Sequence, residues 1–154
     1  MKTRTLVATA MVVAVSAAFS LNAMAGTPKL VNYKIVNETS IPKSLTGKPG
    51  NSKKGRKLAI HRKKGNCLAC HKMPIPEQQF HGEIGPNLAG IGSRYSAGEL
   101  RFLIVNPKVV NEDTIMPAFY KNTGFNAVLK KFKGKTVISA QDVEDIIAYL
   151  LTLK

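Results

Sequence analysis

The chain has no tryptophan, only two cysteines, and nine acidic residues in a total of 154. Six phenylalanines and four tyrosines are its only aromatic side chains, so the protein alone can bury only a modest core. Beyond residue 25 no apolar run approaches the ~20 residues that a membrane-spanning helix needs. These absences predict one small domain with no membrane span after residue 25.

The N-terminus has the pattern of a secretory signal peptide. Lys2 and Arg4 form a short basic region, and residues 6–21 are almost entirely apolar. An A-x-A pattern at residues 23–25 then predicts cleavage before Gly26. A membrane anchor is the alternative, but the run is too short and ends in small residues. We therefore expect export to the periplasm, with residues 1–25 removed.

Both cysteines lie in one pentapeptide, Cys67-Leu68-Ala69-Cys70-His71. It matches C-x-x-C-H, the attachment pattern of a c-type haem. Each thiol can form a thioether with one haem vinyl group, and His71 follows closely enough to bind the iron. The motif predicts one covalently bound haem c, held by Cys67 and Cys70, with His71 as an axial iron ligand.

Two other uses of a Cys-x-x-Cys pair have to be weighed. A disulfide or thioredoxin-like pair usually lies beside a βαβ pattern, which the surrounding sequence lacks. Half of a zinc site would need two further ligands, and only His61 and His81 remain. A zinc or disulfide scaffold without haem is therefore one alternative. The export signal favours haem, because c-type haem is attached outside the cytoplasm.

The iron is expected to have a second axial ligand. Met73 lies two residues after His71, too near to cross to the opposite face of the haem. Met116 lies 45 residues after His71, and Pro117 biases it towards extended backbone. Filling a gap in the core is the commoner use of a methionine. We predict Met116 as the sixth ligand, with His81 as the alternative.

Two further residues are expected beside the haem. Pro86 has a rigid backbone and a free carbonyl that can accept the second ring N–H of His71. Gly85, which precedes it, allows close approach to the ring. Arg94, with Tyr95, is predicted to reach a haem propionate. An ordinary Gly-Pro turn and a surface arginine are the simpler explanations.

Positive charge is concentrated in residues 43–64, where no Asp or Glu occurs. The basic residues there are Lys43, Lys48, Lys53, Lys54, Arg56, Lys57, Arg62, Lys63 and Lys64. Such a patch accelerates encounters with acidic partners, although a solvated helix face is the default explanation of a charge run. Because it leads into the haem motif, we expect it to dock an acidic electron acceptor. Export makes nucleic acid an unexpected partner.

Three helices are predicted downstream of residue 52. The first covers residues 53–64 and ends at Gly65. A capping box from Ser96 to Glu99 begins the second, which Pro107 stops. A similar start at Ser139 begins the third, over residues 140–152.

The other segments of the mature chain are expected to be irregular. Residues 26–52 are punctuated by proline and glycine and predict an N-terminal extension outside the core, with one short strand at 30–36. This extension either wraps a partner subunit or forms a loose terminus. Residues 106–137 are expected to be mostly loop.

The order of these features resembles the class I cytochrome c family. A basic helix, Cys67–His71, the Gly85-Pro86 turn, a middle helix, Met116 and a C-terminal helix follow one another over residues 53–152. The resemblance implies a mainly α, class I cytochrome c fold in residues 53–154. It also implies that the first and last helices cross, with Gly55 close to Tyr149.

Three longer stretches resemble the SoxX family, the small monohaem subunits of the SoxAX cytochromes of thiosulfate oxidation. They are residues 65–71, 82–88 and 113–120, which read GNCLACH, GEIGPNL and DTIMPAFY. The resemblance implies a heterodimer with a SoxA-like cytochrome that oxidatively links thiosulfate to a carrier-protein cysteine, as an L-cysteine S-thiosulfotransferase.

In that scheme the catalytic chemistry belongs to the partner, at a haem with a modified cysteine ligand. This chain has no cysteine beyond the haem motif, so we expect no catalytic residue in it. Its role would be to accept electrons and pass them to a downstream acceptor. A free-standing periplasmic cytochrome c carrier is the alternative, which the extension at residues 26–52 disfavours.

Overall fold

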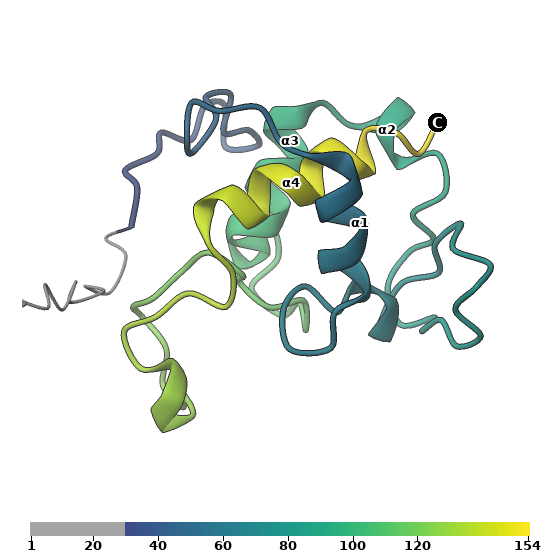
Figure 1. Cartoon of the computed structure of the whole chain (residues 1–154). Helices are drawn as coiled ribbons and strands as arrows, with labels where there is room; N and C mark the ends of the chain where they lie inside the picture. Colours follow the sequence, from purple (N-terminus) through teal and green to yellow (C-terminus); the bar gives the residue numbers. More distant parts are fainter. Residues whose placement is uncertain (1–29) are drawn as a thin grey trace, which may run out of the picture.

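Two helices far apart in the sequence cross at the centre of the molecule (Figure 1). The computed structural model describes residues 30–154, and the predicted signal peptide lies outside the described residues. Helix α1 spans Ser52–Ile60 and α4 spans Ala140–Leu150. Among the described residues, no other pair of helices is in such extensive contact. The crossing implied by the class I resemblance is therefore present.

A glycine allows α1 and α4 to touch backbone to backbone. Gly55 is buried, and a Cβ at this position would overlap the backbone carbonyl of Asp145. Gly50, just before α1, meets the carbonyl of Glu144 in the same way. We predicted that Gly55 would approach Tyr149, but the contact occurs one turn earlier in α4. The apolar face of α4 supports it with Val143, Ile146, Ile147 and Leu150, all buried.

Helix α1 is shorter than the predicted 53–64. It begins at Ser52 because the Asn51 side chain accepts the amide of Lys54 at 2.9 Å. It ends at Ile60, and His61 is extended with φ −71° and ψ 111°. The ring of His61 accepts the Lys63 amide at 3.1 Å, a local bond that competes with helix continuation.

The predicted starts of the two later helices are confirmed. Helix α3 spans Ala97–Val105, and both it and α4 open with a reciprocal capping box. Ser96 pairs with Glu99, and Ser139 pairs with Asp142. Helix α3 ends before Pro107, as predicted, while α4 ends at Leu150 rather than 152. Capping chemistry is local, which is why sequence alone located these starts.

The remaining elements are single turns. They are η1 (Cys67–Ala69), α2 (Ile91–Arg94), η2 (Pro107–Val109) and η3 (Lys130–Phe132). The mainly α fold class is confirmed, and residues 106–137 are mostly loop. The strand predicted at 30–36 is wrong: over residues 30–154 the only β-pairing is one isolated bridge between Val36 and Ser40. None of the helices in the described part is long and apolar enough to cross a membrane.

We expected the irregular segment before α1 to lie outside the core, but part of it packs into the core. Ile41 and Leu45 are 1% and 4% exposed and lie in the same cluster as the apolar residues of α3 and α4. The Asn51 amide also donates to the buried carboxylate of Asp145 at 2.8 Å. The described part of the extension, residues 30–51, is thus attached to the helices. The domain boundary at residue 53 stays a prediction.

A buried ion pair makes this attachment. Arg101 of α3 and Glu144 of α4 are 4% and 5% exposed and form two parallel bonds of 2.8 Å. Arg101 also donates to the carbonyl of Ile41 at 2.6 Å, while Glu144 accepts the amide of Leu45 at 2.8 Å. Each charge is therefore paired and further hydrogen-bonded, as a charge taken out of water requires.

Arg101→Met should lower the free energy of unfolding by about 3–5 kcal/mol, because it leaves the Glu144 carboxylate buried without its partner. Chemical denaturation of the mature protein measures this loss. The double variant Arg101→Met/Glu144→Leu should recover a large part of it, since no charge is then stranded. Arg62→Met, at an exposed arginine, is the control. A single-variant loss no larger than that of the control would contradict a structural role for the pair.

Candidate functional site

One tight turn holds the Cys-x-x-Cys-His motif. The amides of Cys70 and His71 both donate to the carbonyl of Cys67, at 3.1 and 2.9 Å. Both thiols are free, and burial raises the pKa of the Cys67 thiol to about 11. Among residues 30–154, no group of three or more His, Cys, Asp or Glu side chains is placed to hold a metal ion. The turn therefore suits covalent attachment of its two thiols better than a zinc cage.

The His71 ring is oriented by the carbonyl predicted for that role. Nδ1 of His71 lies 2.7 Å from the oxygen of Pro86. A carbonyl can only accept, so Nδ1 carries the proton and Nε2 keeps its lone pair. A neutral imidazole whose distal nitrogen is free is the form that binds a metal. The backbone of Pro86 thus fixes both the tautomer and the direction of the ring.

Glycines bring this second segment against the motif. The amides of Gly82, Gly85 and Leu88 donate to the carbonyls of Leu68, Cys70 and Lys72 at 2.7 to 2.9 Å. A Cβ at Gly85 would overlap the His71 ring, which confirms the close approach that we predicted there. A Cβ at Gly82 would overlap the carbonyl of Ala69. Sequence reasoning missed Gly82, although its spacing of three from Gly85 was a usable signal.

Arg94 lies in the same region but has protein partners. Its guanidinium donates to the carbonyls of Ala89 at 2.9 Å and Asn87 at 3.1 Å. It therefore clamps the loop that follows Pro86. Tyr95, beside it, is 40% exposed. Contact between Arg94 and a haem propionate stays a prediction, since the bonds shown here are to backbone.

The two methionines of the described chain differ in burial. Met73 is 4% exposed and belongs to the core, in keeping with its exclusion as a ligand. Met116 is only partly buried and lies at the edge of that core. Its loop is fixed where the amides of Phe119 and Tyr120 donate to Ile104 and Val105, the last turn of α3, at 3.2 and 3.3 Å.

His81 has a bond that argues against it as the sixth ligand. Its Nδ1 accepts the amide of Met73 at 3.2 Å, so the proton of the neutral ring is on Nε2. Nε2 is buried and, within the described structure, has no hydrogen-bond partner. For Nε2 to bind iron it would have to give its proton to Nδ1, which would break the bond to Met73.

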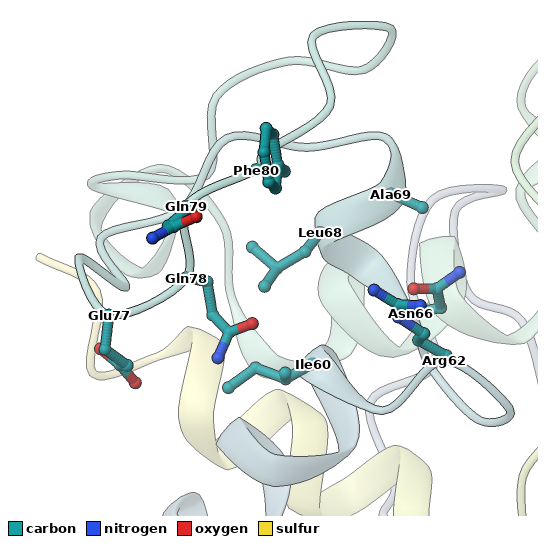
Figure 2. A pocket seen from close by; sticks show the side chains of 9 residues that line it. All are labelled: Ile60, Arg62, Asn66, Leu68, Ala69, Glu77, Gln78, Gln79 and Phe80. Carbon is teal, nitrogen blue, oxygen red and sulfur yellow. The ribbon is translucent and has the colours of Figure 1, made fainter.

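A cavity of about 540 Å³ lies beside the motif (Figure 2). It is lined by Ile60, Arg62, Asn66, Leu68, Ala69, Glu77, Gln78, Gln79 and Phe80. None of the predicted iron ligands lines it, so it is separate from the His71 side of the motif. Phe80 at its edge is 88% exposed, and Ile84 nearby in sequence is 70% exposed.

The comparison with protein families agrees with this geometry. The family model described as Cytochrome c matches residues 52–154.

The chain belongs to the cytochrome c family.

A solved structure, described as the crystal structure of SoxXA from P. pantotrophus, contains a chain similar to this cytochrome. The two are 39% identical with a TM-score of 0.73, and the match covers 79% of this chain and 94% of that chain. No curated protein matches. The class I cytochrome c fold and the resemblance to SoxX are therefore confirmed.

The described residues suit a covalently bound haem. Free thiols at Cys67 and Cys70 would hold it, and His71, whose Nδ1 is bonded to Pro86, would coordinate the iron through Nε2. When bound, the haem supplies one-electron exchange between ferrous and ferric iron. The protein would contribute a fixed imidazole, a carbonyl that makes this imidazole more electron-donating, and a methionine loop anchored to α3.

Gly85→Ala should displace the His71 ring or the Pro86 carbonyl, because its Cβ has no room beside the ring. In holoprotein matured by a cytochrome c assembly system, we expect a changed visible spectrum and a lower yield of attached haem. Gly134→Ala is the control, because Gly134 has open space around it, although its φ is +67°. If Gly85→Ala matches the control in spectrum and yield, the contact does not control the ring.

Proposed function

We propose that this cytochrome is the electron-accepting and relaying subunit of a SoxAX-type complex in the periplasm. The observation that carries the proposal is the likeness to a SoxXA chain, at 39% identity over 94% of that chain. The complex would oxidatively link thiosulfate to a cysteine of a carrier protein. The free-standing carrier is the alternative.

The electron count of that reaction defines the task of this subunit. Joining thiosulfate to a thiol forms one sulfur–sulfur bond, releases the thiol proton and removes two electrons. A chain with one Cys-x-x-Cys-His motif is expected to hold one haem and so to carry one electron at a time. Two relay events therefore serve each coupling, and the bond-forming chemistry belongs to the SoxA-like partner. No cysteine remains in this chain to take part in it.

The surface supports an assembly with another protein. Phe80 and Ile84, 88% and 70% exposed, lie in the segment that joins the Cys67–His71 motif to Pro86. Large exposed apolar side chains beside a cavity are typical of protein interfaces rather than of free surface. By contrast, the described part of the extension already packs on its own core, so it supports assembly less than we expected from sequence.

Met116→Leu should abolish the far-red charge-transfer band of ferric haem and lower the reduction potential, because a thioether ligand favours ferrous iron. Met73→Leu is the matched control: the same chemical change, at a buried residue, should leave both properties unaltered. Absorption spectra and redox titration of the holoproteins measure the two effects. An intact band in Met116→Leu would reject Met116 as the sixth ligand.

Co-purification tests the proposed complex. Affinity isolation of the tagged mature protein from its native cells should recover a larger c-type cytochrome in equal amount. The isolated complex should be reduced on addition of thiosulfate together with its carrier protein. Recovery solely as a monomer that thiosulfate does not reduce would support the free-standing carrier instead.

A further inference from the structure

A long surface excursion separates the predicted sixth ligand from the last helix. Residues 121–136 leave and rejoin the fold at one point, where the amides of Val137 and Ile138 donate to the carbonyl of Phe119 at 3.0 and 3.3 Å. We call this segment the lysine loop. It extends away from the crossing helices and carries the single turn η3 (Figure 1). None of its residues is buried.

The lysine loop carries positive charge only. Its lysines are Lys121, Lys130, Lys131, Lys133 and Lys135, and no acidic residue occurs between Asp113 and Asp142. Across residues 30–154, the ion pairs involve only Arg56, Lys64 and Arg101 as cations, so no loop lysine meets a carboxylate. Two of the lysines lie over phenyl rings instead, at 5.4 and 4.9 Å from the ring centres.

Unlike the lysine loop, the basic patch expected at residues 43–64 is partly neutralised by carboxylates. Arg56 pairs with Glu77, and Lys64 pairs with Asp142 at 3.1 Å. These carboxylates come from distant parts of the chain, which is why the sequence did not show them. Seven of the nine basic residues at 43–64 still have no ion-pair partner within the described structure, whereas in the lysine loop none of the five lysines has one.

The loop is costly to the isolated protein. Five like charges repel one another, and closing the excursion orders many residues without fully burying any apolar side chain in return. Leu129 and Phe125 are left 68% and 41% exposed among the lysines. A surface of this kind, charged with a few apolar side chains, suits brief electrostatic association with another protein.

Its position connects it to electron transfer. The base of the lysine loop is Phe119, which lies three residues after Met116. The amide of Phe119 donates to the carbonyl of Ile104 in the last turn of α3. A protein bound there would lie near Met116, the predicted sixth ligand. An anionic membrane would also attract lysines, but adhesion to a membrane does not need this proximity to the predicted iron ligand.

We propose that the lysine loop docks an acidic face of the protein that takes electrons from this cytochrome, an inference that rests on the proposed relay function. The bound haem would supply one electron to reduce the acceptor, with no bond formed and no proton moved. Charge attraction brings the acceptor to the loop, and salt weakens the encounter.

The test compares two triple variants of equal charge. Lys130→Gln/Lys131→Gln/Lys133→Gln alters the loop, and Lys53→Gln/Lys54→Gln/Lys57→Gln alters exposed positions of α1. Binding of fluorescent poly-L-glutamate to the holoprotein measures docking. The rate of oxidation of the ascorbate-reduced holoprotein by hexacyanoferrate(III) measures delivery of the electron to an anion.

At low ionic strength the loop variant should lose roughly 3- to 10-fold in both binding and rate, and the α1 variant should remain near the wild type. Molar salt should remove the difference. Equal losses in both variants, or a larger loss in the α1 variant, would overturn the proposal. Loop-dependent binding to phosphatidylglycerol vesicles without binding to poly-L-glutamate would overturn it in favour of a membrane.

Failure of this proposal can be told apart from failure of the relay function. Each variant is first checked for a normal haem spectrum and for recovery with the larger cytochrome. Normal results there, with equal losses in the two variants, reject the docking site alone. Absence of haem or of the complex in the wild type rejects the relay function.

Discussion

The contact between α1 and α4 at Gly55 is the constraint on which the rest of the fold depends. Because no side chain separates the two backbones at this point, the end of α1 and the motif that follows it have a fixed position relative to the C-terminal helix. The far end of α4 is held in a similar way: the Gly92 amide donates to Leu153 at 2.9 Å, and a Cβ at Gly92 would lie 2.7 Å from the carbonyl of Leu151. Helix α4 is thus the element against which α1, α2 and α3 are all placed.

The haem motif is positioned by backbone rather than by large side chains. Carbonyls of residues 68, 70 and 72 receive amides from the segment that carries Pro86, and at Gly82 and Gly85 a Cβ would overlap the motif. A ring held by a carbonyl and a turn has little freedom to change its orientation. This suits a centre that is required to change oxidation state without rearranging its ligands.

Features coded by neighbouring residues could be predicted from the sequence. The capping boxes at Ser96 and Ser139 formed as predicted, and the Pro86 carbonyl meets His71 where a second ring nitrogen needs a partner. Features that depend on residues far apart could not. Ile41 and Leu45 are held in the core by bonds to Arg101 and Glu144. No local sequence pattern connects these two residues with the ion pair. Likewise, the partial neutralisation of the basic patch became visible only once Glu77 and Asp142 were placed in space.

The bond between Leu45 and Glu144 has a consequence for the order of events in biogenesis. Its two ends are 99 positions apart, and the bond from Asn51 to Asp145 spans 94. While the chain is being synthesised, the amides of Leu45 and Asn51 have no native acceptors until α4 has emerged. Contacts of such long range are also slow to form. Cys67, partly buried in the finished fold, would therefore be more accessible during that interval to an enzyme that attaches haem than after the last helix has docked.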